Sequence, residues 1–189
     1  MQSTLVGTTE GAVQPQTAEK RRRMRVVVAV DESEVSSYAL SWAMDHLLRP
    51  SVPAELNQEP VLVTLVHVVR PFHQYINPAG PAIHSSTAVL ESVRKAQEEH
   101  ATEVLSRALQ ICRGKMAQPM VKTETLILEG EARDKICQVT EEMHVDLLVV
   151  GSRGLGMIKR TFLGSVSHYC AYHASCPVLI VRPPKESSQ

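Results

Sequence analysis

Two apolar segments of strand length, residues 60–69 (PVLVTLVHVV) and 145–151 (VDLLVVG), restrict what this chain can fold into more than any other feature. Both are apolar almost from end to end, whereas a strand with one face in water alternates apolar and polar residues. A nearly continuous apolar strand is typical of a parallel sheet that helices cover on both faces. We therefore expect both segments in the interior of such a sheet.

Segments that favour strands alternate with segments that favour helices along the rest of the chain. Three more strands are predicted at residues 24–30, 121–128 and 178–182, and helices at about 36–49, 87–113, 132–144 and 165–174. This alternation predicts an α/β domain in which right-handed crossovers place helices on both faces of a parallel sheet. It does not predict the order of the strands.

The first two helices carry local signals of their own. The first is expected to bury the face that holds its regularly spaced apolar residues, Val35, Leu40, Ala43 and Leu47. Gly114 is expected to end the second helix, because glycine is the residue most often found just past a helix C-terminus.

The length and composition fit a single globular domain with tails. Hydrophobic residues make up 43% and charged residues 21% of the 189 residues, which supplies enough apolar material for one core. Residues 1–23 show no apolar periodicity and are expected to form a flexible arm. We predict a folded domain at residues 24–184 and a short tail at residues 185–189.

The charge balance argues against nucleic acid as a partner. The chain has 20 basic and 20 acidic side chains, whereas proteins that bind nucleic acids through their phosphates are usually basic. Aromatic residues make up only 4%, too few for a platform on which bases stack. We therefore expect no nucleic-acid partner.

The sequence shows no signal for a membrane or for secretion. Its apolar runs are shorter than the roughly 20 residues that cross a bilayer, and its N-terminus lacks the charged and then apolar regions of a secretory signal. No C-x-x-C pair occurs among the cysteines, which are Cys112, Cys137, Cys170 and Cys176. This is typical of free thiols in a reducing compartment. We expect a cytoplasmic protein without membrane contact, and the basic run at residues 20–23 leaves a nuclear location open.

The fourth predicted strand leads into a glycine-rich loop, GSRGLGMIKRTFLGS, at residues 151–165. Glycine lets backbone amides approach an anion closely, and Gly164-Ser165 lies where the next helix begins, with its unpaired amides and the positive end of its dipole. Residues 147–185 contain no Asp or Glu but include five basic residues: Arg153, Lys159, Arg160, Arg182 and Lys185. Isolated glycines more often only form turns. Here spacing, position and charge together predict a phosphate site.

Two better-known phosphate motifs do not fit this loop. Met157 stands where a P-loop requires lysine. A dinucleotide-binding fingerprint would follow the first strand, where this chain has DESEVSS instead.

Asp31 is a second candidate for ligand binding, because ligands of open parallel α/β sheets bind beyond the carboxyl ends of the strands. Its carboxylate can accept a hydrogen bond from a ribose hydroxyl or help to hold a divalent ion against phosphates. It can equally cap the first helix. The residues alone leave both roles open.

Other chemistry-bearing residues favour structural roles. His67 lies inside an apolar strand and is expected to be a hydrogen-bonded core residue rather than a catalytic base. Zinc-type donors gather near the C-terminus, at His168, Cys170, His173 and Cys176. Only Cys170 and His173 share a helical face, so no metal site is expected there.

Four segments resemble the universal stress protein family, in the single-domain form common in plants. They are VVAVDES, LVHVV, EGEARDKI and GSRGLGMIKRTFLGSVSHYCAYHASCPVLIVRP, and the resemblance covers about residues 25–183. The family's nucleotide-binding signature, G-x2-G-x9-G-[S/T], is matched without departure at residues 151–165. The resemblance implies a Rossmann-like, adenine nucleotide alpha hydrolase-like three-layer sandwich whose five-stranded parallel sheet has the order 3-2-1-4-5.

The resemblance also implies a site for ATP or AMP. Carried over by matched position, its nucleotide-binding residues are Ala29, Val30, Asp31, Val68, Gly151, Arg153, Gly154, Gly164, Ser165 and Val166. Those from Gly151 onward would line the ribose and phosphates, Asp31 would meet the nucleoside, and the Val68 backbone would read the adenine edge. A Mg²⁺ or Mn²⁺ ion can accompany the phosphates near Asp31. Some ATP-binding members have proline two residues before the aspartate, where this chain has Ala29.

We expect a stress-response protein whose nucleotide regulates a conformation or an assembly. No catalytic residues are expected, and ATP hydrolysis, if present, would be slow. The alternatives are a slow ATPase or phosphotransferase that uses Asp31 with a divalent ion, and a dimeric scaffold for protein partners with a vestigial pocket. In the family order the apolar last strand lies at a sheet edge, so we also expect a homodimer through that strand.

Overall fold

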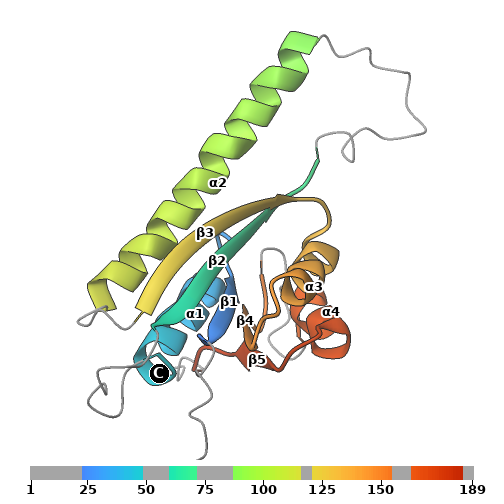
Figure 1. The fold of residues 1–189 in the computed structure, drawn as a ribbon. Helices are drawn as coiled ribbons and strands as arrows, with labels where there is room; N and C mark the ends of the chain where they lie inside the picture. Colours follow the sequence, from blue (N-terminus) through green and yellow to red (C-terminus); the bar gives the residue numbers. More distant parts are fainter. Residues whose placement is uncertain (1–22, 49–59, 72–86, 116–120, 155–162, 185–189) are drawn as a thin grey trace, which may run out of the picture.

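The computed structural model describes residues 23–48, 60–71, 87–115, 121–154 and 163–184. Within these ranges lie five strands and four helices (Figure 1): β1 (Arg25–Ala29), α1 (Glu34–His46), β2 (Val61–Val69), α2 (Thr87–Lys115), β3 (Val121–Glu129), α3 (Ala132–Glu142), β4 (Leu147–Gly151), α4 (Ser165–His173) and β5 (Val178–Val181). The expected arm, apart from Arg23, and the expected tail lie outside the described residues. The domain limits therefore stay a prediction.

The strands form one parallel sheet in the order β3-β2-β1-β4-β5. This is the order that the resemblance implied, and the predicted fold class is confirmed. β1 lies in the middle of the sheet, and α2 lies on the opposite side from α3 and α4 (Figure 1). None of the described helices is both long enough and apolar enough to cross a bilayer.

Two apolar cores hold the helices to the sheet, one on each face. Val26 and Val28 of β1 pack with α1 and α2, while Val27 between them packs with α3 and α4. All three valines are fully buried. Successive residues of a strand point to opposite faces of the sheet. A strand with both faces buried is therefore apolar at successive positions, which explains the sequence pattern.

Two local predictions about the helices are wrong. Leu47 is 42% exposed, because it is the C-cap of α1 and the buried face continues through Met44 and Leu48 instead. Gly114 lies inside α2, which ends at Lys115. Cys112 in the same turn is buried in the core, so packing outweighs the weak helix propensity of glycine.

The buried thiol of Cys112 predicts how stability depends on pH. Burial raises the pKa of this thiol from 9.0 to about 11, because an apolar environment disfavours the charged thiolate. As the pH rises from 9.0 to about 11, the unfolded chain loses a proton that the folded chain keeps. The free energy of unfolding therefore falls with rising pH, by about 2 to 3 kcal/mol for this group alone. Below that window the thiol adds no pH dependence.

Urea unfolding at pH values from about 8 to 11 measures this slope. Cys112→Ala is expected to be less stable throughout, because it leaves a cavity, but to decline less steeply with pH. Part of the slope should remain, because burial also raises the pKa of Cys137, Cys170 and Cys176. An unchanged slope in the variant would contradict the prediction.

Candidate functional site

A cavity of about 450 Å³ opens at the carboxyl ends of β1, β2 and β4. The chain leaves β1 for α1 on one face of the sheet and leaves β4 for α4 on the other. Neighbouring strands whose connections diverge in this way leave a crevice between them, where open α/β sheets bind their ligands. The cavity therefore lies where the fold class leads one to expect a site.

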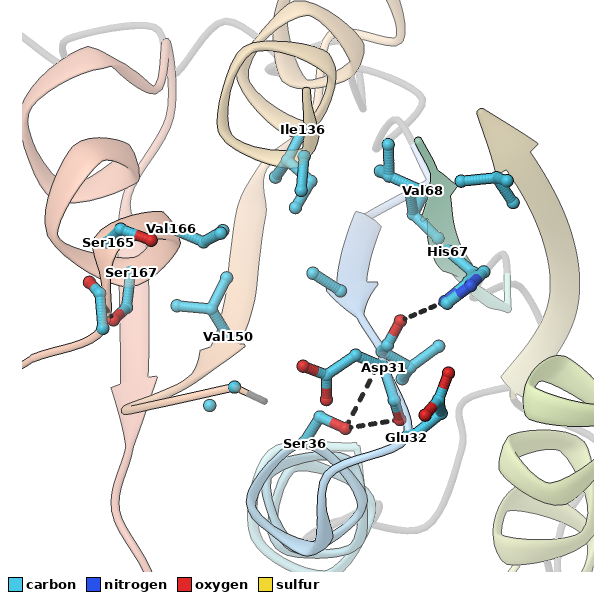
Figure 2. A pocket seen from close by; sticks show the side chains of 18 of the residues that line it. Asp31, Glu32, Ser36, His67, Val68, Ile136, Val150, Ser165, Val166 and Ser167 are labelled. Atoms are coloured by element: carbon cyan, nitrogen blue, oxygen red, sulfur yellow. Dashed lines mark hydrogen bonds between the residues drawn. The ribbon is translucent and has the colours of Figure 1, made fainter. Parts of the chain in front are cut away.

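Residues that the sequence analysis named for a nucleotide site come together around this cavity (Figure 2). All ten line it: Ala29, Val30, Asp31, Val68, Gly151, Arg153, Gly154, Gly164, Ser165 and Val166. They come from three strand ends and from the start of α4. Their ligand-binding roles stay a prediction.

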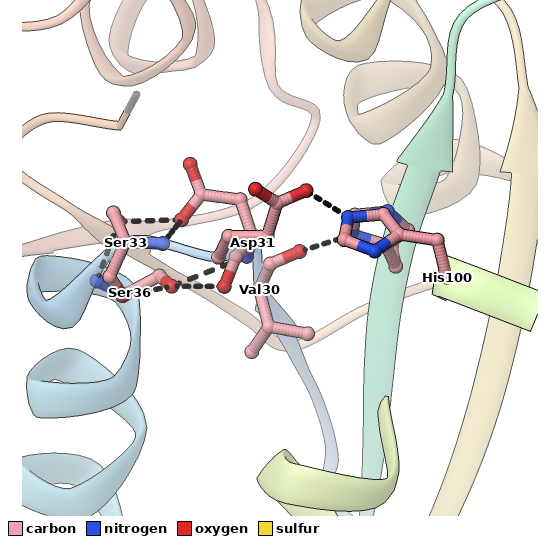
Figure 3. Close-up of polar contacts among 7 residues, drawn as sticks. Val30, Asp31, Ser33, Ser36 and His100 are labelled. Carbon is pink, nitrogen blue, oxygen red and sulfur yellow. Dashed lines mark hydrogen bonds and ion pairs between the residues drawn. The ribbon is translucent and has the colours of Figure 1, made fainter. Parts of the chain in front are cut away.

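Asp31 does not cap α1. The N-cap is Ser33, whose hydroxyl accepts a hydrogen bond from the Ser36 amide at 3.2 Å. Oδ1 of Asp31 accepts from the Ser33 amide at 3.0 Å and from the Ser33 hydroxyl (Figure 3). Oδ2 points toward Gly154, where an added Cβ would lie 2.5 Å from it. Of the two roles left open by the sequence, the cap is wrong, and one carboxylate oxygen of Asp31 is available at the cavity.

The glycines of the loop after β4 allow close backbone approaches. A Cβ on Gly151 would lie 3.1 Å from the Val35 side chain and 3.2 Å from the Ser36 amide nitrogen. A Cβ on Gly164 would lie 3.2 Å from the Cα of Arg153. All three distances are tighter than a side chain usually tolerates. The small residues at the two described ends of the loop therefore let Gly151 lie against the first turn of α1 and Gly164 lie against Arg153.

The two ends of this loop are joined by hydrogen bonds to one carbonyl. The Ser152 carbonyl accepts from the Gly164 amide at 2.9 Å and from the Ser167 hydroxyl at 3.1 Å. Gly164 is the N-cap of α4 and provides no side-chain cap. The first amides of a helix have no partner within the helix, so those of Ser165 and Val166 are available to an anion at the positive end of the helix dipole.

Val68 presents unpaired backbone groups to the cavity. The Val66 carbonyl accepts from the Val30 amide at 2.9 Å, and β1 pairs with β2 no further than Val66. The N–H and C=O groups of a parallel strand point alternately to its two neighbours. The N–H and C=O groups of Val68 therefore point to the same side as those of Val66. At Val68, however, they lie beyond the end of β1. One donor and one acceptor lie side by side there.

His67 is a hydrogen-bonded core residue, as predicted. Its side chain is buried, and Nδ1 lies 2.9 Å from the Val30 carbonyl oxygen (Figure 2). A carbonyl can only accept, so Nδ1 carries the proton of this hydrogen bond. The interaction holds the end of β1 against β2, next to Asp31.

Two walls of the cavity come from helices that the sequence analysis did not connect with the site. Ala132 and Ile136 of α3 form an apolar wall. They are four residues apart and so share a helical face, a signal that could have been noticed in EGEARDKI.

The other wall comes from α2, through Gln97 and His100. The Gln97 side chain donates to the Arg70 carbonyl at 2.9 Å, and His100 pairs with Glu32 (Figure 3). No local pattern in the sequence pointed to this wall, because it depends on how α2 lies across the ends of β1 and β2.

Comparison with known proteins gives one consistent family. Residues 22–182 match the model of the universal stress protein family. Universal stress protein PHOS34 of Arabidopsis thaliana is 30% identical over 168 residues, which cover 87% of this chain and 64% of PHOS34. The chain thus spans less than two thirds of that relative. Universal stress protein YxiE of Bacillus subtilis is 30% identical over 158 residues, which cover 84% of this chain and 98% of YxiE.

Solved structures of the same family share the fold. The universal stress protein UspA from Lactobacillus plantarum superimposes with a TM-score of 0.62 at 25% identity, over 86% of this chain and 99% of that one. A universal stress protein family protein from Arabidopsis thaliana, solved with AMP bound, superimposes with a TM-score of 0.56 at 25% identity, over 85% of this chain and 92% of that one.

Proposed function

Since this chain belongs to the universal stress protein family, we propose that it binds an adenine nucleotide, ATP or AMP, in the cavity at the carboxyl ends of β1, β2 and β4. The nucleotide acts as a regulatory ligand rather than as the substrate of an efficient enzyme. AMP in the related Arabidopsis structure supports the ligand class.

The observation that carries the proposal is the uncapped start of α4 beside the glycine loop. Arg153 and the first turn of α4, with Ser165 and Val166, line the cavity. Residues 147–185, which contain this loop, include no Asp or Glu. Helix N-termini that are free of side-chain caps favour phosphate. The phosphates of the nucleotide bind here.

The backbone of Val68 accounts for the choice of adenine. Its free N–H can donate to adenine N1, and its free C=O can accept from the adenine amino group. Guanine presents a donor and an acceptor in the opposite order on the same edge, so both hydrogen bonds would be lost. Unpaired polar groups are penalised strongly when a ligand buries them. Adenine is therefore preferred over guanine.

Asp31 contacts the ribose through Oδ2, because Oδ1 is already held by Ser33. A Mg²⁺ or Mn²⁺ ion fits the site only in association with the phosphates. Within the described residues no three His, Cys, Asp or Glu side chains form a group that could hold a metal, and magnesium commonly binds through one or two carboxylates and phosphate oxygens.

The requirements of phosphoryl transfer favour a regulatory role for the nucleotide over a catalytic one. Efficient phosphoryl transfer needs a positioned base and several positive groups around the transferred phosphate. Asp31 has one oxygen engaged by Ser33 and would meet the ribose with the other, which leaves it poorly suited to act as that base. Steady-state turnover that is fast and falls in Asp31→Asn would overturn this part of the proposal.

Thermal unfolding with ATP, AMP and GTP tests the proposed ligand. A ligand that binds only the folded state stabilises it by RT ln(1 + [L]/Kd), about 2.7 kcal/mol at a concentration 100 times the Kd. ATP or AMP is expected to raise the Tm by several degrees, and GTP at the same concentration to raise it much less. No shift with any adenine nucleotide at millimolar concentration would overturn the proposal.

We also propose that the protein forms a homodimer through β5, which is an edge of the sheet. The carbonyls of Pro177 and Val181 bond to the β4 side, so by strand alternation the backbone groups of Val178 and Ile180 point outward. An unpaired edge of apolar residues is a template for a second strand, and pairing with a second copy would cover it.

Light scattering of the wild type and of Ile180→Pro tests this dimer. The wild type is expected to have twice the chain mass at micromolar concentration. Proline at position 180 removes an outward N–H without removing a bond to β4, so a folded monomer is expected. Leu179→Pro removes an N–H that faces β4, so this control variant should be less stable. A monomeric wild type would rule the dimer out.

A further inference from the structure

Ser33 and Ser36 hold Asp31 in place on two sides (Figure 3). Ser33 donates to Oδ1 with both its amide and its hydroxyl. The Ser36 hydroxyl accepts from the Asp31 amide at 3.1 Å and lies 2.9 Å from the Asp31 carbonyl, to which it can donate. Ser36 is only 4% exposed. The side chain and the backbone of Asp31 are therefore both held before any ligand binds.

This arrangement leaves one oxygen of the carboxylate for a ligand. Oδ1 already accepts two hydrogen bonds from Ser33, while Oδ2 lies beside Gly154 at the cavity. We propose that Ser33 is a positioning residue for Asp31, and that the fixed Oδ2 makes the site selective for nucleotides that carry ribose hydroxyls over their deoxy counterparts. The inference rests on the proposed adenine-nucleotide function and extends it to the sugar.

Two physical effects produce this selectivity. A carboxylate that is already ordered loses no rotamer freedom when a hydroxyl binds to it, whereas ordering a free side chain weakens binding by about 2- to 10-fold. A deoxynucleotide would bury Oδ2 without a donor, and a buried charged acceptor that lacks its partner is strongly disfavoured. Release of Asp31 would weaken both the binding and the selectivity.

The contribution of Ser33 as a helix cap has to be separated from its contact with Asp31. Loss of an N-cap serine destabilises a helix whatever the ligand is. A cap effect would therefore lower the affinity for ATP and for deoxy analogues of ATP by the same factor. A positioning effect would lower only the affinity for the nucleotide whose hydroxyl Asp31 contacts. This difference between ligands is a readout that a purely structural role does not change.

The experiment measures Kd by calorimetry for ATP, 2′-deoxy-ATP and 3′-deoxy-ATP. Wild type is expected to bind ATP about 10-fold more tightly than at least one deoxy analogue. Ser33→Ala is expected to lose about 3- to 10-fold in ATP affinity and less than about 2-fold for that analogue. Ser33→Thr keeps the hydroxyl and should retain wild-type values. Ser37→Ala, an exposed serine on the same helix, is the matched control.

A double variant completes the test. In an Asp31→Asn background, Ser33→Ala should have little further effect on ATP affinity, because the two residues act through one contact. Equal losses for all three nucleotides in Ser33→Ala, or equal affinities of wild type for all three, would overturn the inference while leaving nucleotide binding intact. If wild type binds none of the three, the proposed function itself fails and this inference fails with it.

Discussion

The Gly154→Val variant is expected to fold normally and to lose about 100-fold or more in affinity for adenine nucleotides. The reason is geometric. A Cβ at this position would lie 2.5 Å from Oδ2 of Asp31, and among the residues that the structure describes it would meet only that carboxylate within 4 Å. The new side chain would displace the carboxylate and occupy the space next to it. Gly154 is exposed and outside both cores, so the fold should tolerate the change.

Calorimetric titration with ATP and AMP measures the loss, and the Tm without ligand measures the fold. Gly114→Ala is the matched control, because a Cβ there meets no atom of the described residues within 4 Å. It should leave the Kd unchanged and raise the stability by about 0.5 to 1 kcal/mol, since alanine is the better helix residue. A Gly154→Val protein that binds ATP within about 3-fold of wild type would show that the carboxylate is not part of the site.

The Leu40→Ala variant is expected to lower the free energy of unfolding by about 3 to 4 kcal/mol. Leu40 is completely buried in the core between α1, α2 and the sheet. Truncation removes apolar contacts and leaves a cavity that the close-packed surroundings fill only in part. Because α1 also carries Ser33 at its start, looser packing of this helix should weaken nucleotide binding as well.

Urea unfolding at neutral pH measures this loss, with an m-value close to that of wild type if both proteins unfold in two states. Leu47→Ala, at the C-cap of the same helix, provides the comparison. Leu47 is 42% exposed, so its truncation should change the stability by less than about 1 kcal/mol. Similar losses for the two variants would mean that the core does not lie where the structure has it.

Much of the fold could be predicted from residues that are close together in the sequence. The nearly continuous apolar segments at residues 60–69 and 145–151 predict the parallel sheet. A strand that is buried on both faces is apolar at successive positions and does not alternate with polar ones. Helix ends were less certain. The predictions for Gly114 and Leu47 are wrong because the ends of α1 and α2 depend on which residues reach the core.

The candidate site could be predicted in part. Glycines at the ends of the loop after β4 have a spacing that is visible in the sequence, and the resemblance to a known family identified the ten residues that line the cavity. The role of Asp31 could not be decided in the same way. Asp31 and Ser33 are both good N-cap residues two positions apart, and only the backbone geometry shows that Ser33 is the cap.

The sequence by itself determined the fold class and the position of the glycine-rich loop for which we propose anion binding, because strand apolarity, glycine spacing and a stretch without acidic residues are properties of short segments. Tertiary structure decided which oxygen of Asp31 is free, which backbone groups of Val68 are unpaired and which helices wall the cavity. The Glu32–His100 pair joins residues 68 positions apart. Such contacts arise only when the helices pack on the sheet, and no local pattern encodes them.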